Sequence, residues 1–511
     1  MDMRKNVGVK AVVAVSMVGL LMTACSAEKQ TTDQPTSAQQ TEKAKDATPT
    51  TIEIMSTLTG VAPKETSDVQ KELEKLTNTK LNITWVPETA YKEKLNATMA
   101  SGTLPQVMFT NETKSANIIN AARSGAFWEV GPYLKDYPNL SKQMDPEVLK
   151  GIAIDGKFYM LPRHRDAARH VITIRKDWLD KLGLAMPKTL DDLYKVSKAF
   201  TENDPDGNGK KDTVGFVEDM LNALVRSIAV YHGAPMNYGV QNGQVVPNFM
   251  TAEYLEGLKF YKKLYAEKLM NSDFAIINAQ QRRDMMAQGK AGIMIAVETD
   301  APLVYKDAIK LNPKAEFDLI QGVAGPQGLK VSATSGYNGA MLFSKSSIKT
   351  EAELKKILAF YDKISTPEIM TLMSKGIKDI DYKIVDGGFV EPVNPRADDR
   401  KSDANYLFFG VANPNIELPT KSTDPLVIKG KKLVADNAKI AIYDVTTPLD
   451  SKTKTEKGPE LDKISRDAQI KFIMGEIDEA GYKKSLEQWS KAGGDQIIKE
   501  FTEDYKKQGG K

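Results

Sequence analysis

The sequence predicts an α/β fold, because strand-like and helix-like segments alternate along the first part of the folded chain. Residues 51–55 (TIEIM) alternate apolar and polar side chains, as a half-buried strand does. Val69, Leu73 and Leu76 recur at helical spacing. In order, we expect a strand over 51–55, a helix over 68–76, a strand over 81–86, a helix over 91–99 and a strand over 105–109. This β-α-β-α-β order implies a parallel sheet with right-handed crossovers.

The ends of these strands indicate where a ligand binds. In open α/β sheets, ligands lie beyond the carboxyl ends of the strands. The loops over 57–60 and 110–112 follow two such ends. We therefore expect Thr59, Asn111 and Glu112 to contact a ligand.

The remaining chain continues as a mixture of helices and strands. Strands are expected over 171–174, 291–297 and 339–344, and helices over 177–184, 190–200, 252–269, 282–289, 351–364, 367–375, 464–473 and 476–492. From residue 377 to the last two helices the chain is polar and irregular. No repeat and no basic stripe is present.

Residues 1–24 predict a signal peptide. Arg4, Lys5 and Lys10 give a basic start, and the apolar run over 11–24 is too short to span a bilayer. Cys25, the only cysteine of the chain, follows directly. A single cysteine excludes a disulfide framework.

Cys25 has two interpretations. It is incidental to a nearby cleavage site, or residues 21–25 (LMTAC) form a lipobox, which they resemble although Met22 stands where Leu is usual. The lipobox interpretation predicts that Cys25 is acylated and anchors the protein on the outer face of a Gram-positive cell membrane. Residues 25–50 then form a disordered tether, because residues 26–50 contain no aromatic residue and no Val, Ile, Leu or Met.

Composition argues against a nucleic-acid partner. The chain has 511 residues with 70 Lys or Arg and 67 Asp or Glu, and removal of residues 1–24 takes away three basic residues and one acidic residue. The balance that remains is close to neutral, whereas nucleic-acid binding needs a basic surface.

Four segments carry a family resemblance. They are residues 101–107 (SGTLPQV, with Gln106 in place of the usual Asp), 156–162 (GKFYMLP), 177–184 (DWLDKLGL, followed by Pro187 and Thr189) and 289–293 (GKAGI). In this order the chain resembles the extracellular solute-binding proteins of family 1, in particular the long lipoproteins of Gram-positive bacteria.

The resemblance implies a two-lobed fold like that of periplasmic binding proteins, with a hinged cleft between the lobes. It implies one lobe over 51–162 plus 338–365 and another over 166–332 plus 366–511, with crossings near 162–166, 332–339 and 364–366. It further implies a monomer that captures an oligosaccharide and delivers it to the permease subunits of an ABC importer.

Residues 204–212 (DPDGNGKKD) have the spacing of a calcium loop. Side-chain oxygens fall at relative positions 1, 3, 5 and 9, and a glycine stands at position 6, as in EF-hand loops. The expected ligands are Asp204, Asp206, Asn208, the Lys210 carbonyl and Asp212. The final bidentate Glu is missing, and the alternative is an Asx-rich turn without metal.

Sugar binding needs flat apolar faces and planar hydrogen-bonding groups. Among the aromatic residues Trp85, Trp128, Tyr159, Tyr231, Tyr238, Tyr337 and Tyr406, we prefer Tyr337, because it lies at an expected crossing beside Asn338. Glu298 and Asp300 follow a strand end and are candidates for binding hydroxyls.

A basic cluster lies at the first expected crossing. Arg163 and Arg165 stand there with His164 and Arg169. A guanidinium pairs bidentately with a carboxylate, so the cluster suits an acidic sugar such as a uronate. The other interpretation is surface ion pairing with Asp166.

Three other function classes stay open at this point. A peptide-binding protein would share the fold and the anchor. A secreted carbohydrate-active enzyme needs a pair of carboxylates, but no nucleophile elbow, phosphate loop or His-based metal motif is present, and we expect no enzyme. An adhesive surface protein would be indifferent to small ligands.

Overall fold

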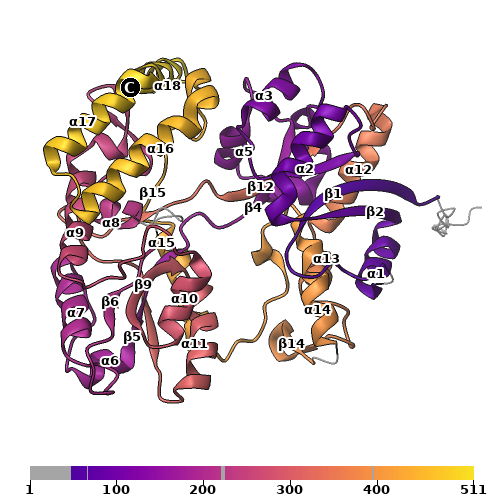
Figure 1. Cartoon of the computed structure of the whole chain (residues 1–511). Helices are drawn as coiled ribbons and strands as arrows, with labels where there is room; N and C mark the ends of the chain where they lie inside the picture. The colour runs from indigo at the N-terminus through magenta and orange to yellow at the C-terminus, as the bar shows by residue number, and fades with distance from the viewer. Residues whose placement is uncertain (1–47, 66, 220–224, 394–395, 511) are drawn as a thin grey trace, which may run out of the picture. The chain divides into compact units, whose positions relative to one another are not determined.

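The structure is a computed structural model that describes residues 48–65, 67–219, 225–393 and 396–510. The predicted signal peptide, Cys25 and the predicted tether up to Ala47 lie outside these residues. The segment Thr48–Lys511 forms one compact unit, and Figure 1 shows its elements. None of the helices in the described part combines the length and apolar content that a bilayer crossing requires.

The first sheet has five strands in the order β2-β1-β3-β12-β4. They are β1 (Thr50–Leu58), β2 (Thr79–Pro87), β3 (Val107–Thr110), β4 (Met160–His164) and β12 (Tyr337–Phe343). β1 pairs in parallel with β2 and with β3, which confirms the expected parallel pairing of these three strands. β12 is antiparallel to both of its neighbours, so the sheet as a whole is mixed.

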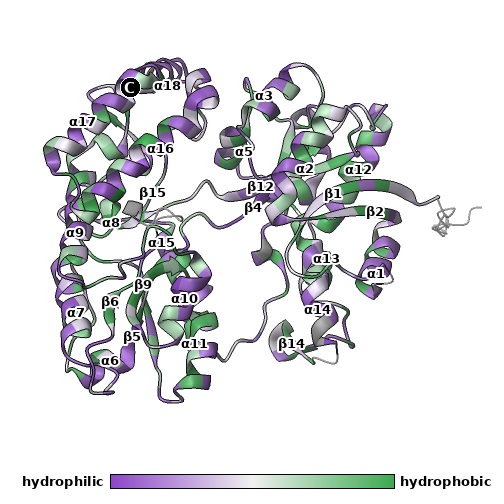
Figure 2. Cartoon of the chain, in the orientation of Figure 1, coloured by the Kyte–Doolittle hydropathy of each residue, from purple (hydrophilic) through white to green (hydrophobic). Residues whose placement is uncertain are grey.

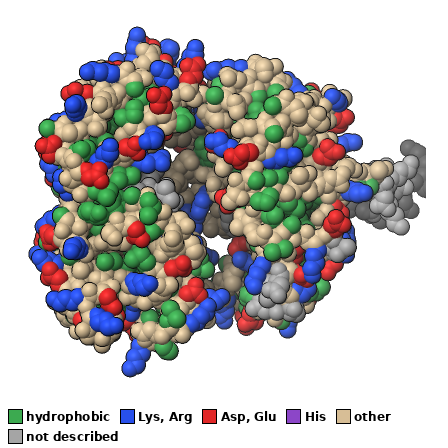
Figure 3. Space-filling view, in the orientation of Figure 1, with side chains coloured by type: hydrophobic (Ala, Val, Ile, Leu, Met, Phe, Trp, Pro, Cys, Tyr) green, Lys and Arg blue, Asp and Glu red, His purple; other side chains and the backbone are tan. Residues whose placement is uncertain are grey.

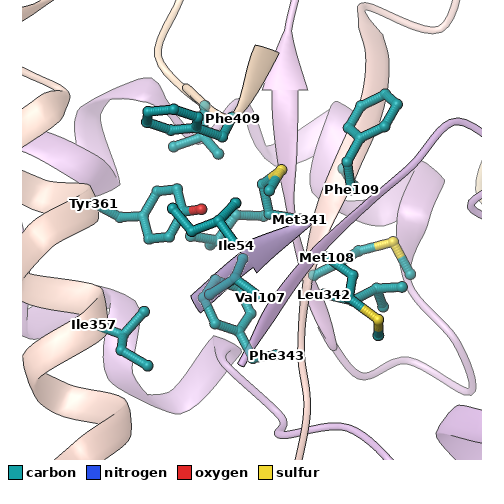
Figure 4. Close-up of a cluster of buried hydrophobic side chains, with 14 of the residues drawn as sticks. Ile54, Val107, Met108, Phe109, Met341, Leu342, Phe343, Ile357, Tyr361 and Phe409 are labelled. Carbon is teal, nitrogen blue, oxygen red and sulfur yellow. The ribbon is translucent and has the colours of Figure 1, made fainter. Parts of the chain in front are cut away.

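Helices, 3-10 turns and one hairpin surround these strands, and most of them contribute side chains to one apolar core. They are α1 (Asp68–Thr77), α2 (Glu88–Ser101), α3 (Ala116–Arg123), α4 (Pro138–Gln143), α5 (Pro146–Ile152), α12 (Glu351–Ile364), α13 (Pro367–Lys375) and α14 (Ala397–Asp403), with the 3-10 turns η1 (Gly131–Asp136), η5 (Ala404–Phe408) and η6 (Pro414–Ile416) and the hairpin β13 (Tyr382–Val385), η4 (Asp386–Gly388) and β14 (Phe389–Pro392). Figure 4 shows Ile54, Val107 and Met341 of the sheet facing Tyr361 and Phe409. We call this set of elements lobe 1.

The second sheet has the order β10-β5-β9-β6. Its strands are β5 (His170–Arg175), β6 (Val214–Phe216), β9 (Ala291–Val297) and β10 (Phe317–Ile320). Hydrophobic residues concentrate in these strands, while the helices around them are two-sided (Figure 2). Gly292 of β9 leaves room for Trp178 and Phe200, which stack edge to face, and an added Cβ there would lie 2.2 Å from the Phe200 ring.

The remaining elements pack on the second sheet or on a small adjoining core, and we call the set lobe 2. They are α6 (Lys176–Lys181), α7 (Leu190–Glu202), α8 (Val225–Tyr231), β7 (Tyr238–Gln241), β8 (Gln244–Pro247), η3 (Asn248–Met250), α9 (Ala252–Ala266), α10 (Ala279–Ala287), α11 (Asp300–Leu311), β11 (Val331–Ser332), α15 (Pro425–Asn437), β15 (Ala441–Ile442), α16 (Lys452–Met474), α17 (Glu479–Trp489), η7 (Ser490–Gly494) and α18 (Asp495–Lys507). A capping box of Thr189 and Asp192 starts α7.

Residues from 366 onward were expected to belong to lobe 2, but the first part of this segment packs in lobe 1. Met370 and Met373 of α13, and then Tyr406 and Phe409, are buried in the lobe 1 core rather than in lobe 2. Their aromatic partners explain the difference, since Tyr406 and Phe409 contact Trp85 with ring centroids 5.9 and 6.3 Å away. The chain therefore crosses for the third time between η6 and α15, and not near 364–366.

The first two crossings run side by side. The Arg165 amide donates to the Gly336 carbonyl at 2.9 Å, and the Thr334 amide donates to the Ala167 carbonyl at 2.8 Å. These backbone bonds join the segments that connect β4 to β5 and β11 to β12.

Candidate functional site

The strand ends of the first sheet place the predicted ligand residues along one edge. Thr59 follows β1, Asn111 follows β3, Arg163 lies in β4 and Tyr337 begins β12. Because successive side chains of a strand point to opposite faces, Tyr337 and Asn338 enter two different cavities. The predicted site residues therefore divide into two groups.

The first cavity has a volume of about 990 Å³ and is lined by both lobes. Five basic and three acidic residues lie in its wall, so we call it the basic cavity. Figure 3 shows that the molecular surface is hollowed between the two lobes. Its predicted site residues are Thr59, Arg163, Arg165, Glu298 and Asn338.

Arg163 is held by aromatic faces. Its guanidinium carbon lies 4.7 Å from the centroid of the Phe408 ring and 5.7 Å from that of Phe109. Burial and the nearby charge of Arg165 lower the pKa of Arg163 to about 10. Stacking on a ring leaves the in-plane N–H groups of a guanidinium available to an acceptor.

Arg165 is a second partly desolvated cation in the same wall. Burial lowers its pKa, and the charge of Arg169 lowers it further. Within the described residues, no carboxylate lies within 4.0 Å of Arg163 or Arg165. Asp166 instead accepts a hydrogen bond from Asn415 at 2.7 Å, so the interpretation of the cluster as ion pairing with Asp166 is not what the structure shows.

The other acidic residues of the basic cavity are already paired. Arg169 binds Glu298 bidentately, with its Nη2 2.9 Å and its Nε 3.0 Å from carboxylate oxygens. Lys375 pairs with Glu417 at 2.9 Å. With five basic and three acidic residues, the wall as a whole is positively charged.

The second cavity has a volume of about 710 Å³ and contains Asn111, Glu112 and Tyr337. Its charges pair with each other, so we call it the charge-paired cavity. The pairs are Lys92 with Glu112 at 2.7 Å, Lys114 with Asp450 at 2.8 Å and Lys454 with Asp462 at 2.6 Å. The Tyr337 hydroxyl lies 3.0 Å from the Thr113 hydroxyl.

Asp300 belongs to neither cavity wall. Its side chain is buried and contacts Arg282 at 3.4 Å and Arg283 at 3.3 Å. Arg282 also pairs with the fully buried Asp219 at 2.9 Å. This network holds the start of α11, and each Asp300 carboxylate oxygen contacts a guanidinium rather than a cavity.

Two aromatic residues of the basic cavity were not among the sequence candidates. Phe408 and Tyr443 line it, and Tyr443 is 53% exposed. Of the aromatic candidates, Tyr231, Tyr238 and Tyr406 are core residues instead. Both missed rings lie in the polar, irregular stretch after residue 377, where no periodic signal marks them.

The predicted metal loop folds on itself through Asp204. The amides of Gly207, Asn208 and Gly209 donate to its carboxylate at 3.0–3.1 Å. The Asn208 amide group donates to Asp206 at 2.8 Å and to Asp212 at 3.1 Å. Across the described residues, no group of three or more His, Cys, Asp or Glu stands in metal-binding geometry.

Comparison with known proteins places the chain in a family. The family model described as "Bacterial extracellular solute-binding protein" matches residues 48–370. The polygalacturonan/rhamnogalacturonan-binding protein YtcQ of Bacillus subtilis is 41% identical over 439 residues, which cover 85% of this chain and 87% of YtcQ. Lipoprotein LipO of the same organism is 38% identical over 465 residues, covering 89% of this chain and 92% of LipO.

Solved structures share the fold. The alginate-binding protein AlgQ2 without calcium ion superposes with a TM-score of 0.69 at 20% identity, over 90% of this chain and 98% of AlgQ2. The Streptococcus pneumoniae substrate-binding protein FusA in complex with kestose gives 0.63 at 21% identity, over 90% and 99%. The two-lobed α/β fold expected from the resemblance is confirmed. The chain belongs to the bacterial extracellular solute-binding protein family.

Proposed function

We propose that this chain is the extracellular, lipid-anchored binding component of an ABC importer, and that it captures a uronic-acid-containing oligosaccharide in the basic cavity. The observation that carries the proposal is the pair of guanidiniums of Arg163 and Arg165, which lack an acidic partner among the described residues. YtcQ, which is described as binding polygalacturonan and rhamnogalacturonan, is a relative whose ligand fits this chemistry.

The two arginines suit a ligand with more than one carboxylate. They stand two residues apart in and just after β4, about 7 Å along a strand, and each can hold one carboxylate through paired N–H donors. Thr59 and Asn338 supply neutral groups for hydroxyls, and Tyr443 supplies an exposed ring for a sugar face. Closure of the two lobes removes water from these contacts.

The test changes the ligand rather than the protein. Binding of oligogalacturonides to the mature chain is measured by titration calorimetry, against the same oligomers with their carboxyl groups reduced to alcohols. Two charge-assisted hydrogen-bonded pairs are worth about 1.5–3 kcal/mol each, so the reduced oligomers should bind at least about tenfold more weakly. Equal affinity for both, or a preference for peptides, would contradict the proposal.

The anchor rests on Cys25, which we propose is acylated. LipO, a relative over most of its length, is named a lipoprotein. Mass spectrometry of the N-terminal peptide of the cell-derived protein should show a diacylglyceryl cysteine, and Cys25→Ser should release the chain into the medium. A Cys25→Ser chain that stays in the membrane fraction would point to another anchor.

We also propose that the loop over 204–212 binds calcium as a structural ion. Its donors are hard oxygens, as calcium prefers, and among the described residues no Lys or Arg side chain pairs with the carboxylates of Asp204, Asp206 or Asp212. Burial and the adjacent Asp204 raise the pKa of Asp206, as expected for carboxylates held together. Thr213 is turned inward and donates to the Phe200 carbonyl, so it is no ligand.

Thermal unfolding tests this loop. After chelation, added calcium should raise the melting temperature, and Asp206→Asn should remove the increase, while magnesium should have little effect. Asp191→Asn, a surface change at the start of α7, is the matched control. If wild type and Asp206→Asn respond equally to calcium, the loop is an Asx-rich turn without metal.

A further inference from the structure

The charge-paired cavity contains a contact that joins the two lobes at a distance from the basic cavity. Lys114 lies in lobe 1, between β3 and α3, and Asp450 lies in lobe 2, just before α16. The Lys114 ammonium is 2.8 Å from the Asp450 carboxylate, and the two side chains are 25% and 38% exposed. Lys114 also donates to the Ala153 carbonyl, which fixes its position against lobe 1.

A steric contact stands beside this ion pair. Thr447 of lobe 2 packs on Gly151 of α5, so closely that a Cβ added to Gly151 would lie 2.5 Å from the Thr447 methyl group. Glycine is the residue that permits this approach, because any larger side chain would push the two lobes apart at this point.

The lobe 2 side of the contact is rigid. We call residues 444–450 the clasp segment. Its first residue, Asp444, accepts from the Asn237 amide at 2.8 Å, and its last, Asp450, donates its backbone amide to Asp504 of α18 at 3.0 Å. Leu449 is buried in the small core beneath it. A segment held by hydrogen bonds and a buried side chain opens less readily than an exposed loop.

We propose that the clasp segment, through Lys114–Asp450 and Thr447–Gly151, sets the resting separation of the two lobes and thereby slows the release of ligand. The contact lies outside the basic cavity, so it affects every ligand equally and contributes nothing to the choice between acidic and neutral sugars. The proposal rests on the proposed function only for its ligand readout, since lobe separation can be measured without ligand.

Two variants disrupt the contact by different means. Lys114→Met removes the ion pair but keeps the length of the side chain. Gly151→Val keeps the ion pair partners and inserts a steric wedge. Lys454→Met is the matched control, because Lys454 lines the same cavity but pairs with Asp462 of its own helix.

The first measurement uses the ligand-free mature chain. A fluorophore pair, one on each lobe, reports the distance distribution between the lobes. Both disruptive variants should shift it to longer distances, and Lys454→Met should not. The double exchange Lys114→Asp with Asp450→Lys should return the distribution toward that of the wild type.

The second measurement is ligand dissociation by stopped flow, with an oligogalacturonide as the probe. Lys114→Met should raise the dissociation rate about two- to fivefold, the range for a partly exposed ion pair. The affinity ratio between acidic and carboxyl-reduced oligomers should stay unchanged. Unaltered lobe distances in both variants, or an unaltered dissociation rate beside altered distances, would overturn the proposal, whereas a failure of oligogalacturonide to bind the wild type would count against the proposed function alone.

Discussion

The two cavities lie on either side of the first residues of β12, and they differ in how their charges are used. In the charge-paired cavity, Lys92, Lys114 and Lys454 each have a carboxylate within 2.8 Å. In the basic cavity, the pair of Arg169 with Glu298 is of the same kind, but Arg163 and Arg165 are left without one. A partly desolvated charge without a partner costs stability. A protein keeps such a cost where a ligand supplies the missing opposite charge. The comparison therefore marks the basic cavity as the binding site and the charge-paired cavity as structural.

Removal of the unpaired charges should give the largest effect. Arg163→Gln and Arg165→Gln should each weaken binding of an acidic oligosaccharide about 10- to 100-fold, because each loses a charge-assisted contact worth about 1.5–3 kcal/mol. Lys92→Gln removes a charge from the charge-paired cavity and should leave the affinity unchanged. Titration calorimetry measures all three, and a larger loss in Lys92→Gln would reverse our assignment of the cavities.

Some elements of the fold can be predicted from sequence and others cannot. The period-2 pattern over 51–55 and the helical spacing of Val69 and Leu73 predict β1 and α1 correctly, because one buried face imposes each period. The start of α16 was missed, since Pro459 and Gly458 stand within the helix and both oppose helical structure. The assignment of Tyr406 and Phe409 to lobe 1 depends on ring contacts with Trp85, which lies far earlier in the sequence, and no local pattern encodes them.

Removal of the carboxylate that pairs with Arg169 should change ligand affinity less than the arginine substitutions do, and should raise it. Glu298→Gln leaves Arg169 without its bidentate partner and adds one net positive charge to the wall. We expect acidic ligands to bind about fivefold more tightly, since one charge at about 4 Å in water is worth ~1 kcal/mol. The melting temperature should fall, because the Arg169 side chain is only 14% exposed. Weaker binding would instead show that Glu298 contacts the ligand, as the sequence suggested.

The ring under Arg163 should contribute a modest effect. Phe408→Leu keeps a large apolar side chain but removes the aromatic face 4.7 Å from the guanidinium. Loss of a cation–π contact of about 0.5–1 kcal/mol should weaken acidic ligands roughly threefold, with little change for carboxyl-reduced ones. Competition binding with both ligand forms measures the difference, and an equal loss for both would mean that Phe408 stacks on sugar rather than on Arg163.

The candidate site could be predicted from sequence in part. A strand end predicted Thr59, and the crossing predicted Arg163 and Arg165, because topology alone places those positions at the sheet edge. Asn111, at another strand end, lines the charge-paired cavity instead. Whether a charge is paired depends on partners far away in the sequence, such as Glu298 for Arg169, 129 positions later. The division between Tyr337 and Asn338 follows from strand alternation, and only the position of the second lobe decides which side of β12 each cavity occupies.

His164 should produce the smallest effect, a dependence on pH. It lies in the basic cavity between Arg163 and Arg165, and burial lowers its pKa, against the nearby charges of Asp166 and Asp145. Because its pKa is lowered in the folded protein, His164 is neutral at pH 7. The neutral form stabilises the fold above the unfolded pKa of about 6.5, and this stabilisation is lost as the pH falls.

Bound carboxylates favour the protonated imidazole, so affinity for an acidic oligosaccharide should rise as the pH falls from 7 toward 5, while uronates stay ionised. We expect an increase of about twofold, since the ring is partly solvated and screened. Titrations at pH 7 and 5 on wild type and His164→Gln measure it, and a rise that persists in His164→Gln would assign the dependence to another group.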